Sequence, residues 1–240
     1  MSRNLIITGA SRGIGRAIAI KCAQKGDRVA VNFRGNQTAA EETAKLIEDK
    51  GAQAILVQAN VRNKADCERL ASTFEHVDLL VNNAAIGALK PFQKIRFNQW
   101  DLTMESSLRP MWYLSSLVNF NPGANVIGIS SLGSRSFIPG YAAMGAAKAG
   151  MEALTRQLAV ELAPQKVRVN TVCGGLIETD TLQYFPDSMK PLIEHAKTYT
   201  PLGGIGQPED MANAVWMLTQ PEARWITGQV VVVDGGLSLL

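Results

Sequence analysis

A glycine-rich turn near the start of the chain carries the residues best suited to bind a phosphate group. The segment TGASRGIG, residues 8–15, follows a short apolar run and precedes a helical pattern. Glycines at such a junction permit a tight turn, and the first N–H groups of the helix then point toward an anion. We expect the turn to hold the pyrophosphate of a dinucleotide, unless it is an ordinary turn that needs glycine only for its backbone freedom. The residues that would line this site are Gly9, Ser11, Arg12, Gly13, Ile14 and Gly15.

The residues that follow the second apolar run favour NADPH over NADH. An NAD site usually has an Asp or Glu here, which binds the ribose 2′-hydroxyl group. Residues 32–36, NFRGN, contain no acid, and Arg34 is present instead. Together with Arg12 of the glycine turn, Arg34 could hold a 2′-phosphate through forked hydrogen bonds. The alternative is that Arg34 is only a solvated surface charge.

Tyr141 and Lys148 are the candidate reactive pair. They are seven residues apart, which is nearly two full turns at about 100° per residue, so both lie on one face of a helix. Small side chains surround Lys148, because Ala147 and Ala149 flank it, and they permit close approach of a ligand or another helix. The alternatives are a packing role for Tyr141 and a surface position for Lys148.

The strands and helices expected along the chain must position the glycine turn, Tyr141 and Lys148. Short apolar runs alternate with helical stretches, and most of the runs are continuous, as in strands that are buried on both faces of a parallel sheet. The strand candidates are residues 5–8, 28–33, 54–58, 77–81, 125–130, 167–171 and 229–233. This order predicts an α/β fold, a Rossmann-like doubly wound parallel sheet of seven strands with helices on both faces. We expect one dinucleotide-binding catalytic domain over residues 1–240.

The helix that follows Gly140 and the region beyond it should complete the site. Apolar residues such as Met151 and Leu158 share one face of this helix, Glu152 lies off that face, and Pro164 should end the helix. Residues 174–207 show weak periodicity, and a segment of that length is usually functional. Its apolar residues fit a lid over an acyl chain. Basic residues that could dock an acidic carrier protein are Arg109, Lys190 and Lys197.

Composition excludes several other classes of protein. The net charge is only +3 and no basic run occurs, so neither nucleic-acid binding nor a polybasic membrane tag is indicated. The three cysteines are odd in number, and with two histidines they show no spacing of a metal site, so we expect reduced thiols, no metal and a cytoplasmic protein. The start lacks the apolar run of a signal peptide. Residues 110–134 carry no charge but contain prolines, so they indicate a buried helix, a turn and a central strand rather than a membrane span.

Several motifs, in this order, resemble the short-chain dehydrogenase/reductase family over essentially the whole chain. They are TGASRGIG, Asn-Asn-Ala-Ala at 82–85, Ser-Ser at 130–131, the helix with Lys148, and Val-Asp-Gly-Gly at 233–236. The resemblance implies that Lys148 binds the nicotinamide ribose and lowers the pKa of the tyrosine, and that Thr179 holds the carboxamide. It also implies a homotetramer. The positions that match cofactor-binding residues of the family are Asn60, Val61, Asn83, Ala84, Lys148, Gly175, Ile177 and Thr179.

The chain departs from the usual family pattern at the reactive tyrosine. The common spacing is Tyr-x3-Lys, but Met144 stands at that position and the nearest tyrosine is Tyr141, which makes the motif Tyr-x6-Lys. A helix residue that is usually Asn aligns with Ser107. Both departures resemble the enoyl-acyl-carrier-protein reductase branch of the family, and the stretches around residues 82–91 and 174–180 resemble its NADPH-dependent type III.

The spacing gives this resemblance a chemical interpretation. On an ideal helix Tyr141 lies about 4.5 Å further along the axis than a tyrosine at position 144 would. In the reduction of an enoyl thioester, hydride adds to the β-carbon and negative charge develops on the thioester oxygen, three bonds away. A tyrosine displaced along the helix suits that distant oxygen. We expect NADPH-dependent reduction of trans-2-enoyl thioesters, on acyl carrier protein or coenzyme A, with Tyr141 stabilising the enolate. Ser131 would either orient the substrate or line the cofactor site. The alternatives are a ketoreductase of altered geometry, in which the loop returns Tyr141 to the usual place, and a non-catalytic NADPH-binding protein.

Overall fold

Seven parallel strands form one sheet in the computed structural model, which describes residues 2–240 apart from the side chains of Thr181 and Tyr184. The strands are β1 Asn4–Ile7, β2 Arg28–Phe33, β3 Gln53–Gln58, β4 Val77–Asn82, β5 Phe120–Ser131, β6 Arg168–Gly174 and β7 Val230–Val233. Their order across the sheet is β3-β2-β1-β4-β5-β6-β7, and every neighbouring pair is parallel. The predicted doubly wound fold is therefore confirmed.

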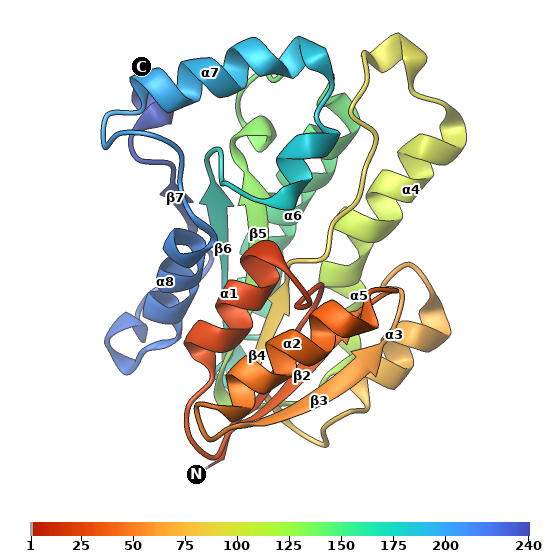
Figure 1. Ribbon diagram of the computed structural model, residues 1–240. Coiled ribbons are helices and arrows are strands. Elements are labelled where there is room, and N and C mark those ends of the chain that lie inside the picture. The colour runs from red at the N-terminus through yellow and green to blue at the C-terminus, as the bar shows by residue number, and fades with distance from the viewer. Residues whose placement is uncertain (1) are drawn as a thin grey trace.

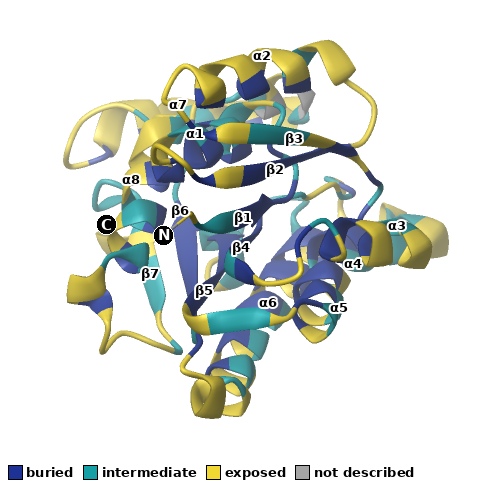
Figure 2. Ribbon diagram, turned by 90° about the horizontal axis from the view of Figure 1, so that it is seen from below, coloured by how far each residue is buried: buried dark blue, intermediate teal, exposed yellow. Residues whose placement is uncertain are grey.

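Helices cover both faces of this sheet (Figures 1 and 2). The helices are α1 Gly13–Cys22, α2 Gln37–Glu48, α3 Lys64–Ala71, α4 Phe97–Ser107, α5 Arg109–Leu117, α6 Ala142–Glu161, α7 Lys190–Tyr199 and α8 Pro208–Thr219. The helices α1, α2 and α8 contribute to the hydrophobic core on one face, and α3, α5 and α6 contribute to the core on the other. Figure 1 shows α7 beyond the end of β6. Among the residues that the structure describes, no helix is both long and apolar enough to cross a membrane.

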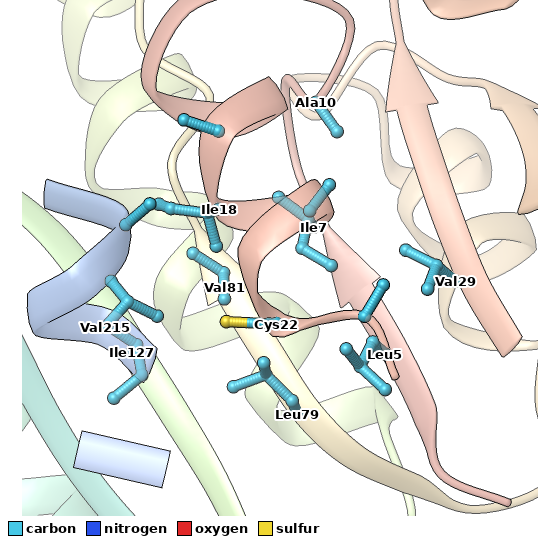
Figure 3. Packing of buried hydrophobic residues seen from close by; sticks show 14 of the residues in the cluster. Leu5, Ile7, Ala10, Ile18, Cys22, Val29, Leu79, Val81, Ile127 and Val215 are labelled. Carbon is cyan, nitrogen blue, oxygen red and sulfur yellow. The ribbon is translucent and has the colours of Figure 1, made fainter. Parts of the chain in front are cut away.

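The two cores explain why the strands are continuous apolar runs. Side chains alternate between the two faces of a strand, so Leu5 and Ile7 pack in one core while Ile6 packs in the other. Figure 3 shows Leu5 and Ile7 in one cluster with Ile18 of α1 and Val81 of β4. Each such side chain contributes about 1.5–3 kcal/mol when fully buried. The glycine turn therefore projects from a strand that is anchored on both faces.

Some boundaries differ from those expected. The uncharged stretch forms α5 and β5 as predicted, but β5 already begins at Phe120. The helix α6 ends at Glu161, and Pro164 lies in the 3₁₀ turn Ala163–Gln165 that follows it. The region 174–207, where the sequence shows only weak periodicity, contains the regular helix α7.

Candidate active site

The glycine turn lies at the carboxyl end of β1, next to β4, where the strand order reverses. Gly9 and Gly13 have positive φ values of +64° and +53°, a conformation that L side chains rarely adopt. A Cβ atom on Gly15 would lie 2.2 Å from the carbonyl oxygen of Gly9, so the helix and the turn are in direct contact. The helix α1 begins at Gly13 and no side chain caps it. Its first N–H groups therefore suit a phosphate.

Thr8 and Asn83 lock this turn to the end of β4. The hydroxyl oxygen of Thr8 accepts hydrogen bonds from the N–H groups of Asn83 and Ala84, both at 2.9 Å. The amide of Asn83 donates to the carbonyl oxygens of Thr8 and Gly9, at 2.9 and 3.2 Å. A Cβ atom on Gly13 would lie 3.5 Å from the methyl group of Thr179. The structure thus brings three of the expected cofactor-binding regions together.

The second strand ends in a buried amide rather than an acid. Asn32 accepts a hydrogen bond from the N–H group of Gly9 at 3.1 Å, and its amide donates to carbonyl oxygens of the β3 region. Arg34 is exposed, and the side chain of Arg12 is 54% exposed, with the Asp180 carboxylate 4.0 Å away. Two exposed guanidinium groups and a neutral amide fit a 2′-phosphate, so this part of the site fits NADPH.

The remaining cofactor candidates have different surroundings. Asn60 shapes the loop after β3, because its N–H group donates to Asp66 at 2.8 Å and its side chain accepts from the N–H group of Arg62 at 3.2 Å. Val61 packs in the hydrophobic core. A Cβ atom on Gly175 would lie 2.7 Å from the Cβ atom of Asp234, and Ile177 is buried in the other core. Ser11 and Ile14 are half-buried within the glycine turn.

Ser131 and Tyr141 meet at the carboxyl end of β5. Their hydroxyl oxygens are 3.0 Å apart, within hydrogen-bond distance. Tyr141 is the N-cap residue of α6, with φ −102° and ψ 9°, so it precedes the helical residues. The ring lies against the backbone of Gly133, where a Cβ atom would be only 2.3 Å from the ring. The two hydroxyl groups could therefore donate to one substrate oxygen.

Lys148 lies on α6 and is buried, with 5% of its surface exposed. Its ammonium group donates to the carbonyl oxygen of Ile129 at 2.6 Å. Burial lowers the pKa of Lys148 to about 8. Burial also raises the pKa of Tyr141, and the hydrogen bond to Ser131 opposes part of that rise. The expected lowering of this pKa by Lys148 is therefore not found, because burial of the phenol is the largest effect.

The residues that depart from the family pattern have packing partners. Met144 is buried, and a Cβ atom on Gly87 would lie 2.6 Å from its terminal methyl group, so Met144 packs against the loop after β4. Ser107 donates a hydrogen bond to the carbonyl oxygen of Ile86 at 3.1 Å and so holds the same loop. Both residues therefore hold the loop after β4 in place.

Glu152 is a residue near the site whose importance the sequence analysis missed. It lies off the apolar face of α6, as expected, yet only 7% of its surface is exposed. Its carboxylate accepts hydrogen bonds from Ser130, Ser134 and Arg135. The position of Glu152 four residues after Lys148 places both on one face of the helix, and this spacing is the signal that could have revealed it.

The expected docking residues all have acidic partners. Arg109 pairs with Glu105 at 3.3 Å, and Lys190 pairs with Asp187 at 2.7 Å. Lys197 pairs with a glutamate on its own helix at 2.9 Å. These exposed pairs leave less positive charge for an acidic carrier than the sequence suggested.

An apolar cavity lies beside Tyr141. It has a volume of about 560 Å³, within the usual range for small-molecule sites. Phe92 and Phe137, which line it, are both strongly exposed, and Ile138 and Pro139 add further apolar surface. The reactive hydroxyl pair therefore lies next to space for an apolar part of a substrate.

Known proteins resemble this chain over almost its full length. A family model described as "Enoyl-(Acyl carrier protein) reductase" matches residues 9–238. The chain is 35% identical to a 3-oxoacyl-[acyl-carrier-protein] reductase of Staphylococcus aureus, covering 99% of this chain and 98% of the relative. It is also 35% identical to a 1-cyclohexenylcarbonyl-CoA reductase of Streptomyces collinus, covering 98% and 86%.

A solved structure supports the same relationship. The angucycline C-6 ketoreductase LanV with bound NADP superposes with a TM-score of 0.90 at 28% identity, covering 99% of this chain and 96% of LanV. The NADP in that structure agrees with the cofactor expected from Arg12 and Arg34.

The expectation of enoyl reduction is wrong in the light of these relatives. The Staphylococcus aureus relative and LanV are named for the reduction of a carbonyl group. The geometry gives a physical reason, because Tyr141 is not displaced along a helix but sits in the cap, with its hydroxyl group 3.0 Å from that of Ser131. The loop thus brings the tyrosine beside the serine despite the longer spacing to Lys148.

The family model and the relatives cover the glycine turn, the Ser131–Tyr141 pair and Lys148 in one continuous match. Oxidoreductase chemistry is common to the names of all these proteins. The chain belongs to the short-chain dehydrogenase/reductase family.

Proposed function

We propose that this protein is an NADPH-dependent ketoreductase that reduces the 3-oxo group of acyl thioesters to a hydroxyl group. The contact between the hydroxyl groups of Ser131 and Tyr141 carries this proposal, because two adjacent donors suit one carbonyl oxygen. The names of the 3-oxoacyl-[acyl-carrier-protein] reductase and of the cyclohexenylcarbonyl-CoA reductase support a thioester as the substrate.

Each site residue has a defined part in this reaction. NADPH, when bound, supplies the hydride that the carbonyl carbon accepts. Ser131 and Tyr141 donate hydrogen bonds to the carbonyl oxygen, and Tyr141 transfers its proton to that oxygen as negative charge develops. Lys148, whose ammonium group also donates to the carbonyl oxygen of Ile129, binds the ribose hydroxyl groups of the nucleotide.

The nucleotide is held by the other elements. The N–H groups at the start of α1 bind the pyrophosphate, and Arg12 and Arg34 bind the 2′-phosphate. Asn60, Val61, Asn83 and Ala84 line the adenosine half, and Gly175, Ile177 and Thr179 line the nicotinamide half. The segment 174–207 acts as a substrate lid of one catalytic domain, and the assembly is a homotetramer in the cytoplasm.

The test compares two substrates that differ only in the functional group. NADPH oxidation is followed with 3-oxoacyl and trans-2-enoyl thioesters of equal chain length, on coenzyme A and on acyl carrier protein. We expect turnover of the 3-oxo substrates, and its loss in both Tyr141→Phe and Ser131→Ala. Turnover of the enoyl substrates alone would contradict the proposal.

A further inference from the structure

The carboxylate of Glu152 is buried beside the site and has no part in the proton transfer proposed above. One of its oxygens, Oε1, accepts hydrogen bonds from the hydroxyl groups of Ser130 at 2.8 Å and Ser134 at 2.6 Å. The other, Oε2, accepts from the guanidinium group of Arg135 at 2.9 Å. Three donors to one buried carboxylate hold it in a single position, because hydrogen bonds to a charged acceptor are strong.

All three donors belong to the segment that carries Ser131. Ser130 precedes it in β5, whereas Ser134 and Arg135 follow it in and after the 3₁₀ turn Leu132–Ser134. Glu152 therefore ties this segment to α6 on both sides of Ser131.

The same turn is also in contact with the ring of Tyr141. A Cβ atom on Gly133 would lie 2.3 Å from Cδ1 and 2.5 Å from Cε1 of that ring. A Cβ atom on Gly145 would lie 2.5 Å from the carbonyl oxygen of Gly133, so the turn is also packed on α6. A shift of the turn would therefore change the position of Ser131 and the support of the Tyr141 ring together.

We propose that Glu152 is a positioning residue that holds the turn 132–135 on α6 and thereby sets the contact between Ser131 and Tyr141. The expected effect of Glu152 on kcat rests on the proposed ketoreductase function. The expected effect of Glu152 on the ionisation of Tyr141 is independent of that function, because it requires no substrate. The competing explanation is an anchor for the fold alone, which would leave the ionisation of Tyr141 unchanged.

Two variants and one control test this role. Glu152→Gln keeps an oxygen for the two serines but presents an amide donor to Arg135, and Glu152→Ala removes all three contacts. Glu161→Gln, at the exposed end of the same helix, is the matched control. We expect kcat for 3-oxoacyl thioesters to fall about tenfold in E152Q and about 100-fold in E152A, as for a small misplacement of reacting groups. The affinity for NADPH should stay within about twofold in all three variants, because none of them touches the nucleotide site.

The ionisation of Tyr141 gives the decisive readout. Tyrosinate absorbance is titrated in each protein and in its Tyr141→Phe counterpart, and the difference reports Tyr141. Because the hydrogen bond between Ser131 and Tyr141 lowers the pKa of Tyr141, its loss in E152A should raise that pKa, whereas the pKa of Tyr141 in E161Q should match that in the wild type. An unchanged titration in E152A and E152Q overturns the proposal, even where activity falls.

The two proposals fail in different ways. If the wild type does not reduce 3-oxoacyl thioesters, the proposed function is wrong, and the titration of Tyr141 still decides the role of Glu152. If E152A does not fold, E152Q and Ser134→Ala supply the same comparison. Ser134→Ala removes one of the bonds to Oε1 and should shift the titration in the same direction as E152Q.

Discussion

Replacement of Lys148 by methionine should change how the stability of the cofactor-free protein depends on pH. Burial lowers the pKa of Lys148 from 10.5 to about 8. At about 1.36 kcal/mol for each pKa unit, the buried ammonium group costs the folded protein about 3 kcal/mol at pH 7. Methionine has a similar length and no charge, so Lys148→Met removes this cost.

The direction of the pH dependence follows from the lowered pKa. The unfolded chain binds the Lys148 proton more tightly than the folded protein does, so the cost is complete below about pH 8 and declines as the pH rises toward 10.5. The free energy of unfolding of the wild type should therefore rise by about 2 kcal/mol relative to that of K148M between pH 7 and about pH 9.5. Loss of the hydrogen bond to Ile129 offsets the benefit of the substitution by about 1.5–3 kcal/mol. That loss leaves little net stabilisation at pH 7.

Urea unfolding of both proteins at the two pH values measures this change. Lys45→Met, at an exposed position of α2, is the matched control, and its difference from the wild type should not vary with pH. A difference in the free energy of unfolding between the wild type and K148M that stays constant from pH 7 to about pH 9.5 would refute the reasoning. It would mean that Lys148 is solvated in the folded protein.

Three further predictions concern the reaction and the nucleotide. Ser131→Ala and Tyr141→Phe should each lower kcat/KM for 3-oxoacyl thioesters by about 10²–10⁴-fold and leave NADPH affinity unchanged, as steady-state kinetics and fluorescence titration would show. Arg34→Ala should weaken NADPH binding by about 10–100-fold without affecting NADH binding, because it removes a charged hydrogen bond to the 2′-phosphate. Gly15→Ala places a Cβ atom 2.2 Å from the carbonyl oxygen of Gly9, so NADPH binding and Tm should both fall; unchanged values would contradict the close contact.

The parts of the fold that follow from repeating patterns could be predicted from the sequence. The β1 residues Leu5, Ile6 and Ile7 are all apolar because the two cores take alternate side chains, and this produces the continuous run that indicates a parallel sheet. The glycine turn was predictable for a similar reason, because positive φ and close contact restrict the residue type at Gly9, Gly13 and Gly15. Local constraints of this kind are visible in residue type alone.

The hydrogen-bond partners of Glu152 could not be predicted from the sequence, because the tertiary fold brings them to it. A glutamate off the apolar face of a helix usually faces water. Here the end of β5 and the following turn cover it and supply the donors Ser130, Ser134 and Arg135. Burial raises the pKa of Glu152, but those hydrogen bonds outweigh burial and hold the pKa below its usual value, so the carboxylate stays charged.

Tyr141 shows why spacing in the sequence was not sufficient to identify the reaction. The displacement of about 4.5 Å assumed helical geometry for three more residues, but Tyr141 precedes the helix and its backbone is not helical. Gly133, in the turn before it, lies against the ring, and the hydroxyl group of Tyr141 is 3.0 Å from that of Ser131. The position of a side chain in the cap depends on the preceding loop, so Tyr141 reaches Ser131 although it precedes Lys148 by seven residues. Met144, which stands where the common Tyr-x3-Lys pattern has its tyrosine, packs instead against the loop after β4.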